Sequence, residues 1–374
     1  KNQILYSTGG FNKSKVDEYL KFCSGIVLAT RVKVMDNDTD GLVLVSTINE
    51  RVELLSIDDL TNFSFTNYIK AFKKINSRLD NVDVSIVRLP SIIGLLGYLL
   101  SKIKNKIIIL EVVGCPWDSY YYYGGLKAKI VAPIMFILTK IATYYSKNTI
   151  YVTDDFLQKR YPSKHKNTLG CSDVVIELSH NILSQRLKNI DTLDERKIRI
   201  GIIGALSSKY KGFDVLFKCI NILDKKEPGK YELEVVGGGS DRSVRKLIEF
   251  YNIDHLVRIV GSLSHPLGVN MWLDSIDIYV QPSKTEGLSR AVIEAMSRGC
   301  ACIGSNVGGM PELLDTRFLH QKDDSEGFAS IINSVSNKVD LTSQCKVNIS
   351  KCEKFNPDTL SRHRSTFYKK SLKK

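Results

Sequence analysis

Residues 276–305, IDIYVQPSKTEGLSRAVIEAMSRGCACIGS, predict a strand, a loop, a helix and a second strand in succession. The first apolar run ends at Ser283, the apolar positions of the helix begin after Gly287, and the second apolar run covers 300–305. Short apolar strands that alternate with helices are typical of a parallel β-sheet that is covered by helices on both faces. This stretch therefore predicts an α/β fold.

The same alternation of strands and helices extends over both halves of the chain. The predicted strands of the first half lie at 3–7, 82–90, 106–114 and 148–154, with a strand–turn–strand over 31–47, and those of the second half also lie at 198–205, 231–239 and 257–262. A polar, weakly periodic segment at 179–197 is interpreted as a linker. We therefore expect two doubly wound Rossmann-like domains, residues 1–180 and 181–355, that face a central ligand cleft. A basic helix at 356–374 is expected to pack back on the first domain.

The composition is typical of a folded protein that contains no metal and no disulfide. Lys and Arg total 53 against 40 Asp and Glu, which gives the 374 residues a net charge of +13. The eight cysteines include no C-x-x-C pair, which favours reduced thiols in a cytosolic protein. The six histidines form no metal-ligand spacing with these cysteines. The chain opens at Lys1 without a signal-peptide pattern and without Met, so we expect a short N-terminal stretch to be missing.

Positive charge is concentrated between Arg88 and Lys166, where twelve Lys and Arg residues accompany only four Asp and Glu. The same segment contains two apolar runs, 92–100 and 130–145. The second run is interrupted by Pro133 and Lys140 and is too short to span a bilayer. Two interpretations stay open for it: a helix buried in the core, or an interfacial helix that lies on anionic lipid.

Two carboxylates and a helix N-terminus occur together in the opening stretch. Glu286 lies in the loop after the first strand, and Gly287 allows the backbone to approach a ligand closely. The amides at 288–290 begin the predicted helix, a position that favours a phosphate group. Glu294 lies on the same face of this helix, because residues at i, i+4 and i+8 nearly align. The two acids can bind hydroxyls at the two ends of a nucleotide sugar, with Lys211 as a cation for the diphosphate between them.

Several motifs of the second half resemble glycosyltransferase family 4, whose members are retaining enzymes of GT-B fold. They are EGLSRAVIEAMSRGCACIGSNVGGMPELL at 286–314, the preceding DIYVQPS, and the segments IGIIGAL…KYKGFDVL, LEVVGGG and RIVGSLS. The resemblance covers about residues 198–314. It is weaker in the first half, where VRLP and EVVGCPWD are similar to bacterial polysaccharide-assembly members of the family.

The resemblance implies a role for each matching residue. Glu286 would be catalytic, contacting the donor sugar and stabilising positive charge at its anomeric carbon. Glu294 would bind the ribose hydroxyls, and Lys211 would neutralise the diphosphate. The other donor-binding residues implied by the resemblance are Gly9, Gly10, Gly204, Leu263, Gly287, Leu288, Ser289 and Arg290.

The sequence departs from the family pattern at two places. Where the family usually has Arg beside the glycine of the first loop, this chain has Ala205, so one cation for the diphosphate is missing. The family also usually carries a His at the end of a strand in the first domain, but no His precedes position 165. We expect Glu111 or Asp118 to take over part of the catalytic role of that His.

The resemblance implies a glycosyltransferase that moves a sugar from a UDP- or GDP-sugar to a saccharide acceptor, with retention at the anomeric carbon. It also implies a lipid-linked acceptor, a place in surface polysaccharide biosynthesis such as capsule or O-antigen assembly, and no metal cofactor. We expect a cytoplasmic protein in peripheral contact with anionic membrane at its inner face, and no nucleic-acid partner. The alternatives are a sugar-nucleotide epimerase of GT-B fold, a catalytically inactive scaffold, and a nonenzymatic basic protein that binds nucleic acid or membrane.

Overall fold

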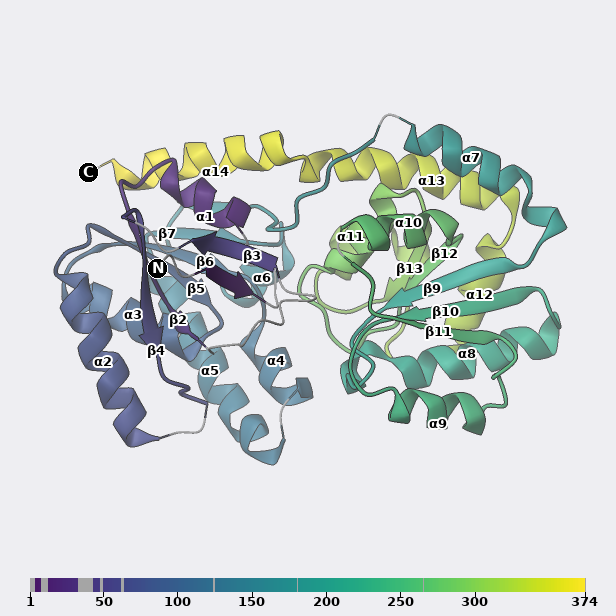
Figure 1. Cartoon of the computed structure of the whole chain (residues 1–374), viewed down its shortest axis with the longest axis horizontal. Coiled ribbons are helices and arrows are strands. Elements are labelled where there is room, and N and C mark those ends of the chain that lie inside the picture. The colour runs from purple at the N-terminus through teal and green to yellow at the C-terminus, as the bar shows by residue number, and fades with distance from the viewer. Residues whose placement is uncertain are drawn as a thin grey trace. The chain divides into compact units, whose positions relative to one another are not determined.

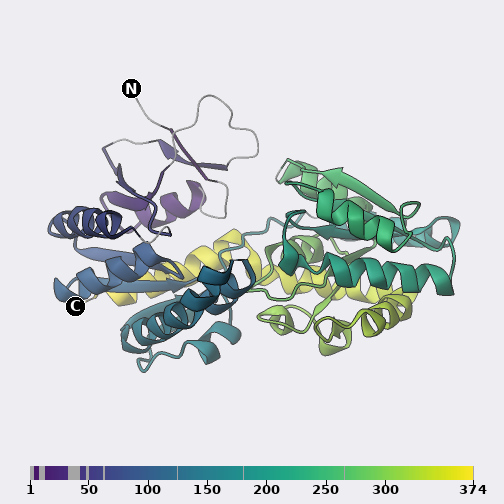
Figure 2. The same cartoon turned by 90° about the horizontal axis from the view of Figure 1, so that it is seen from below.

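The computed structural model describes residues 4–7, 13–32, 43–47, 50–61, 64–123, 125–179, 181–264 and 266–373. The chain divides into two compact units (Figure 1, Figure 2). Unit 1 comprises Lys1–Trp117, Val131–Asp173 and Ser361–Lys374, and unit 2 comprises Asp118–Ile130 and Val174–Leu360. The division therefore falls at 173/174, a few residues before the limit expected from sequence, and places Asp118–Ile130 with unit 2.

Unit 2 is built on a six-stranded parallel sheet. Its strands are β9 (Ile198–Ile203), β10 (Tyr231–Val236), β11 (Val257–Gly261), β12 (Ile278–Gln281), β13 (Ala301–Ser305) and β14 (Leu319–His320). Their order is β11-β10-β9-β12-β13-β14, and every neighbouring pair is parallel. This is the doubly wound order 3-2-1-4-5-6. Successive strands are added on one side of β9 up to β11 and on its other side from β12 onward, so the position between β9 and β12 is the switch point of the sheet. A ligand site is therefore expected outside the carboxyl ends of these two strands.

Helices cover both faces of this sheet, which explains why its strands are almost wholly apolar (Figure 1). One face packs against α8 (Phe213–Lys226), α9 (Arg242–Phe250) and α12 (Ser325–Val335), through a core that includes Ile200, Phe217 and Phe328. The other face packs against α10 (Leu267–Ser275) and α11 (Arg290–Ser297), with Tyr279 and Ile293 in its core. The structure thus confirms the strand–helix–strand succession predicted for 276–305.

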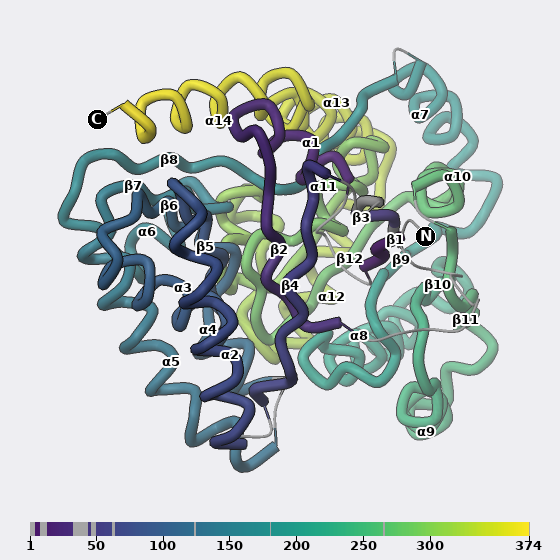
Figure 3. Tube along the Cα trace, turned by 60° about the vertical axis from the view of Figure 1, so that its left-hand side comes forward, coloured from purple at the N-terminus to yellow at the C-terminus, as the bar shows by residue number. Residues whose placement is uncertain are grey.

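The described part of unit 1 contains three smaller sheets instead of one. The largest is parallel, in the order β5 (Val84–Leu89), β6 (Ile107–Val112), β7 (Asn148–Tyr151) and β8 (Thr168–Gly170). Beside it, β2 (Ile26–Arg31) pairs in parallel with β4 (Val52–Ile57), and β1 (Ile4–Ser7) pairs antiparallel with β3 (Val43–Thr47) (Figure 3). Of the strand–turn–strand expected over 31–47, the second strand corresponds to β3, which pairs with β1. The turn and most of the first strand lie outside the described residues, so their pairing stays a prediction.

Alternate side chains of β5 and β6 face different helices. Val87, Leu89 and Leu110 pack with side chains of α3 (Ile92–Ile103) and α5 (Leu126–Tyr145). On the opposite face, Ile86 and Ile109 line a small apolar cavity together with residues of α1 (Lys13–Leu20) and α14 (Pro357–Leu372). The basic helix expected at 356–374 corresponds to α14, and Ser361–Lys374 is grouped with unit 1.

The segment predicted to be a linker, 179–197, is largely helical. It contains α7 (Ile182–Asp191), whose residues Ile182, Arg186 and Ile190 are buried. The Arg186 guanidinium donates to the carbonyl oxygens of Leu273, Ile276 and Arg298, at the ends of unit 2 elements. This interpretation was wrong because a buried Arg counts as polar in a sequence pattern although its stem and its hydrogen bonds belong to the core.

The remaining helices are α2 (Phe65–Leu79), α4 (Pro116–Tyr123), α6 (Phe156–Arg160) and α13 (Lys338–Cys352). Asp324 and Asn337 cap α12 and α13 by accepting from the amides of Gly327 and Asp340, which satisfies donors that the helices leave without a partner. All eight cysteines lie among the described residues and none is in a disulfide, as expected from sequence.

Candidate functional site

A buried ion pair joins the two loops at the switch point of the unit 2 sheet. Lys211 lies in a 3₁₀ turn, η2 (Lys209–Lys211), in the connection after β9, and Glu286 lies in the loop after β12. The Lys211 Nζ is 2.9 Å from the Glu286 Oε1, and the two side chains are only 13% and 11% exposed. Burial by itself would lower the pKa of Lys211, but the Glu286 carboxylate and Tyr210 raise it, so the ammonium stays charged.

A chain of hydrogen bonds along β12 ends on the Glu286 carboxylate. The Tyr279 hydroxyl donates to the Gln281 side chain (2.8 Å), and the Gln281 amide donates to the Ser283 Oγ (2.7 Å). Ser283 in turn donates to the Glu286 Oε1 (2.7 Å). Because each donor points toward the carboxylate, the chain of hydrogen bonds holds Glu286 in one orientation.

None of these three side chains is among the site residues predicted from sequence. Tyr279, Gln281 and Ser283 are fully buried and occupy alternate positions, so they lie on one side of the extended segment. Their signal in the sequence is a period of two in polar residues within the apolar run YVQPS. That signal becomes informative only once both faces of β12 are known to be covered, because a polar face of an exposed strand has the same pattern.

Two close backbone contacts, both permitted by glycine, hold the Glu286 loop. Gly212 follows Lys211 with a φ of +74°, and a Cβ there would lie 1.9 Å from the Pro282 carbonyl oxygen. Gly308 has a φ of +57°, and a Cβ there would lie 1.7 Å from the carbonyl oxygen of Glu286. The Gly212 contact packs the start of the loop against the residue that follows the η2 turn, and the Gly308 contact packs Glu286 against the loop after β13.

The second predicted carboxylate, Glu294, lies inside α11 and is 8% exposed. Burial mainly, and then the negative charges of Glu286 and Glu294, raise the pKa of Tyr279, so both acids lie near this hydroxyl. Ser289 is the N-cap residue of α11, but its side chain makes no capping hydrogen bond. The amides of the first turn have no partner within the helix, and the helix dipole adds partial positive charge there.

The other residues predicted for donor binding are placed as follows. Gly204 is buried after β9, and a Cβ there would lie 3.0 Å from the Cγ of Lys211, so it leaves room for the lysine stem. Leu263 and Leu288 pack against the core that contains Tyr279. The carbonyl of Gly287 accepts from the amide of Gly309, and Arg290 is the first residue of α11. Gly9 and Gly10 lie outside the described residues.

The two residues expected to replace the missing His are in different surroundings. Glu111 is 3% exposed in β6 of unit 1, and its carboxylate accepts from the hydroxyls of Tyr19 and Tyr368 and pairs with Arg88. Burial would raise the pKa of Glu111, but Lys15, Arg88 and the Tyr368 hydroxyl outweigh it and lower the pKa to about 2. A substrate has little access to this carboxylate. Asp118 lies half-buried in the first turn of α4, and a catalytic role for it stays a prediction.

Metal binding finds no support among the described residues, which contain no group of three or more His, Cys, Asp or Glu side chains suited to a metal ion. The two opposite charges of the Lys211–Glu286 site, beside the positive end of α11, suit a ligand that carries both a phosphate and hydroxyl groups.

An α/β unit of this strand order, with a polar site at its switch point and a second α/β unit on the same chain, has the GT-B fold of glycosyltransferases. Solved structures agree: Anabaena HepE, determined in complex with UDP-glucose, matches 85% of this chain over 86% of its own, with a TM-score of 0.63 and 14% identity. This likeness shows the fold.

The chain belongs to the family of group 1 glycosyltransferases. The model of that family, "Glycosyl transferases group 1", matches residues 197–338. The Staphylococcus aureus protein CapJ is 31% identical over 330 residues, 88% of this chain and 81% of CapJ. A second S. aureus protein, the capsular polysaccharide biosynthesis glycosyltransferase CapH, is 25% identical over 67% of this chain and 65% of its own.

A Campylobacter jejuni relative is named N,N'-diacetylbacillosaminyl-diphospho-undecaprenol alpha-1,3-N-acetylgalactosaminyltransferase. It is 24% identical over 74% of this chain and 71% of its own. The chain is thus a glycosyltransferase, as the motifs at 286–314 and 198–205 predict, and the epimerase and nonenzymatic alternatives lose their support.

The packing of the Glu286 loop predicts a large effect of Gly308→Ala. Gly229 is the matched control, because it also has a positive φ (+77°) but nothing within 4 Å of an added Cβ. We expect Gly229→Ala to cost about 1 kcal/mol of backbone strain, and Gly308→Ala at least about 2 kcal/mol more because the loop must move. A Trp117→Phe background leaves Trp272 of unit 2 as the sole tryptophan, whose fluorescence follows urea unfolding. Equal costs for the two substitutions would contradict the assigned contact.

Proposed function

We propose that this glycosyltransferase moves a sugar from a nucleotide diphosphate donor to a saccharide acceptor, with retention at the anomeric carbon. The observation that carries the proposal is the buried Lys211–Glu286 pair at the switch point of the unit 2 sheet, 2.9 Å apart. It places one fixed cation and one fixed anion where α/β sheets of this order bind their ligands.

In the proposed reaction, the bond between the anomeric carbon and the diphosphate oxygen breaks and a bond to the acceptor oxygen forms, while the acceptor proton passes to the departing diphosphate. Lys211 and the first-turn amides of α11 stabilise the negative charge that develops on the departing diphosphate. Glu286, held by Ser283, stabilises the positive charge that develops at the sugar. Both groups are in place before the donor binds, so little reorganisation is needed during the reaction.

The pair also accounts for how two opposite charges tolerate burial while no donor is present. Each compensates the other, so neither is buried unpaired. When a diphosphate enters, the lysine shares its charge with the phosphates, and the Ser283 hydrogen bond keeps Glu286 oriented. Glu294, buried beside Tyr279, is the proposed partner of the ribose hydroxyls.

The donor and acceptor classes draw support from the relatives. HepE was determined with UDP-glucose, which favours a UDP-sugar over a GDP-sugar for the related fold here. The names of CapH and of the Campylobacter enzyme favour polysaccharide assembly on a diphospho-polyprenol acceptor. The missing cation at Ala205 places more of the diphosphate charge on Lys211, and we propose that no metal ion shares it.

A lipid-linked acceptor requires contact with a membrane, and α5 has a surface suited to it. Ile134, Ile137, Ile141 and Tyr144 follow one another at helical spacing and are between 44% and 55% exposed. The opposite face, with Ala132 and Met135, is buried in the protein. The helix therefore combines both interpretations left open from sequence: one face belongs to the core, and the other is apolar and uncovered.

Charge around this apolar stripe favours anionic lipid. From Ser119 to Thr153 the chain contains four lysines and no Asp or Glu. At the end of α5, the Lys164 ammonium lies 4.3 Å and the Lys102 ammonium 5.1 Å from the centre of the Tyr145 ring. Tyrosine rings and lysines that surround an apolar surface are typical of proteins at the headgroup level of a bilayer. Within the described part of the chain, no helix has the length and hydropathy needed to cross the bilayer.

Lys211→Met should weaken donor binding. The methionine stem keeps the packing against Gly204, while loss of the partner of Glu286 lowers the free energy of unfolding. Loss of a charged hydrogen bond of about 1.5–3 kcal/mol corresponds to roughly a 10- to 100-fold higher Kd for a UDP-sugar. Titration calorimetry measures it, after a panel of nucleotide sugars has been screened by thermal shift to select the donor. Lys218→Met, an exposed lysine of α8, serves as control, and an equal loss there would indicate unspecific attraction of the anion.

Glu286→Gln should lower turnover and spare donor affinity. The amide keeps the shape of the side chain but removes the charge that opposes the developing cation, so we expect kcat to fall by about 10²–10³. Donor Kd should change by less than about threefold, since this charge acts mainly in the transition state. Glu249→Gln on the exposed side of α9 is the control. Transfer at the wild-type rate by the Glu286 variant would remove it from the mechanism.

The α5 surface predicts sedimentation with anionic vesicles. The protein should pellet with vesicles rich in phosphatidylglycerol, less with phosphatidylcholine alone, and less again when salt screens the lysines. Ile134→Ser together with Ile137→Ser should weaken binding at least about tenfold, since each buried isoleucine contributes about 1.5–3 kcal/mol. Phe250→Ser together with Val339→Ser removes two exposed apolar side chains from unit 2 as the control. Binding that is indifferent to lipid charge and to the α5 substitutions would contradict this surface.

A further inference from the structure

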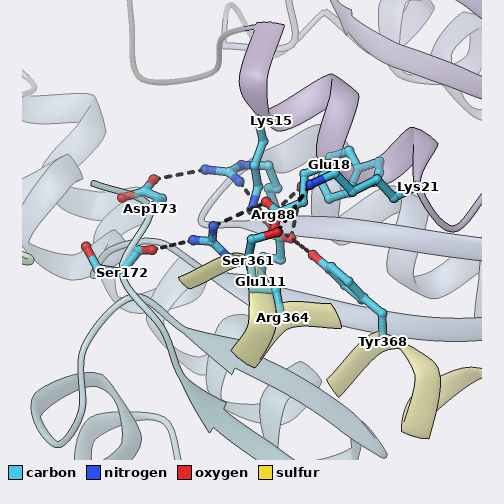
Figure 4. A network of polar contacts seen from close by, with 11 residues as sticks. Lys15, Glu18, Lys21, Arg88, Glu111, Ser172, Asp173, Ser361, Arg364 and Tyr368 are labelled. Carbon is cyan, nitrogen blue, oxygen red and sulfur yellow. Dashed lines mark hydrogen bonds and ion pairs between the residues drawn. The ribbon is translucent and has the colours of Figure 1, made fainter. Parts of the chain in front are cut away.

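A cluster of six charged residues, four of them buried and two partly buried, lies in unit 1 and shares no residue with the Lys211–Glu286 site of unit 2. Its centre is a cross-strand pair: Arg88 of β5 and Glu111 of β6 are register partners, with their Nη1 and Oε2 atoms 2.5 Å apart. The Glu111 carboxylate also accepts from the hydroxyls of Tyr19 (2.9 Å) and Tyr368 (2.8 Å). We call this group the Glu111 cluster; its charged members are Lys15, Glu18, Arg88, Glu111, Asp173 and Arg364 (Figure 4).

The cluster is electrically neutral and connects five segments of the chain: α1, β5, β6, the residues before Val174, and α14. The three cations equal the three anions in number, so no net charge is buried. Glu18 of α1 accepts from the Nη1 of Arg364 at 3.2 Å and lies 3.3 Å from the Lys15 ammonium. Lys15 also lies 3.6 Å from Glu111, and the two tyrosines supply the remaining hydrogen bonds to that carboxylate.

Two of its contacts are made by the last residues before the chain leaves unit 1. The main part of unit 2 begins at Val174. Directly before it, the Asp173 carboxylate pairs with Arg88 at 3.3 Å, and the Ser172 carbonyl accepts from the Nη2 of Arg364 (Figure 4). We call the two points at which the chain passes between unit 1 and the main part of unit 2, 173/174 and 360/361, the crossings. Val174 and Ile176, directly after the first crossing, are buried in a core of unit 2.

The chain returns to unit 1 at Ser361, inside α14, and the cluster holds this segment as well. Ser361 accepts from the Lys21 ammonium of the α1 region at 3.3 Å, and Arg364 and Tyr368 follow at helical spacing on the buried face of α14. On the unit 2 side, the amide of Ile176 donates to the carbonyl of Phe355, so the outgoing and returning segments are also bonded to each other.

We propose that the Glu111 cluster is a positioning device for sugar transfer: it fixes, on unit 1, the two segments that join this unit to the main part of unit 2. The inference rests on the proposed function. In that function the donor binds to unit 2, and we propose that binding of the acceptor also involves unit 1. Glu111 then acts through the connecting segments and not by contact with substrate, in place of the catalytic role expected from sequence.

Such a device has a distinct effect on the reaction. The donor-binding groups lie within unit 2, so donor affinity does not depend on how the crossings are held. The approach of donor and acceptor does depend on it, and misplacement by about 1 Å lowers a rate by up to about 10²-fold. Loosening one crossing therefore lowers kcat and leaves donor Kd unchanged.

The test compares Asp173→Ala with Asp17→Ala. Both remove one carboxylate and one ion pair from unit 1, but the Asp17–Lys13 pair is exposed on α1 and holds no crossing. In Asp173→Ala, amides within 171–176 should exchange with solvent about tenfold faster, while those of β5 and β6 keep their wild-type rates. Turnover should fall by about tenfold with donor Kd within twofold, and Asp173→Glu should restore both readouts in part. Asp17→Ala should leave all of them unchanged.

A second pair of variants, Arg364→Met with the exposed Arg362→Met as control, repeats the test at the returning segment, where hydrogen exchange is measured at the amides of 358–364. Wild-type exchange at both crossings in Asp173→Ala, or an equal rise throughout β5 and β6, would overturn the proposal and leave the cluster as a stabiliser of unit 1. Hydrogen exchange needs no substrate. If the wild-type protein transfers no sugar from any donor, the proposed function fails while the exchange data still decide whether the cluster holds the crossings.

Discussion

The ion pair between Lys211 and Glu286 is the interaction on which the site depends. A lone lysine at this depth would lose most of its hydration, and burial would lower its pKa. Together, Lys211 and Glu286 retain both charges inside unit 2, 2.9 Å apart. The reaction proposed above uses one charge of each sign, and the pair holds both in a form that is stable without ligand.

The rest of the site holds the Lys211 and Glu286 side chains in fixed positions. The strand order of unit 2 brings the ends of β9 and β12 together, and the backbone contacts at Gly212 and Gly308 leave the Glu286 loop no space to shift. The buried chain from Tyr279 to Ser283 then orients the carboxylate. Preorganisation of this kind gains most in a site of low dielectric, because dipoles that are already oriented need no rearrangement as charge develops.

Unit 1 uses buried charge for a different purpose. In unit 2 the Lys211–Glu286 pair lies in the loops after β9 and β12. In unit 1 six charges compensate one another around Glu111 and join β5, β6, α1 and α14 with the segment before Val174. Apolar packing between the sheet and the helices of unit 1 is non-directional, so by itself it does not fix how a helix is oriented on the sheet. Hydrogen-bonded charges add direction, and they add it where the chain enters and leaves the unit.

The sequence by itself determined the parts of this protein that depend on neighbouring residues. Alternating apolar runs and loops gave the α/β class and the elements of 276–305, and Lys211, Glu286, Gly287 and Glu294 are the donor-binding residues that the sequence predicts. The strand pairing of unit 1, the helix at 182–191 and the surroundings of Glu111 required the tertiary structure. The physical reason is that a charged residue in an apolar run is equally compatible with a substrate contact and with a buried partner far along the chain. Only the packing of α1 and α14 on β6 decides between them.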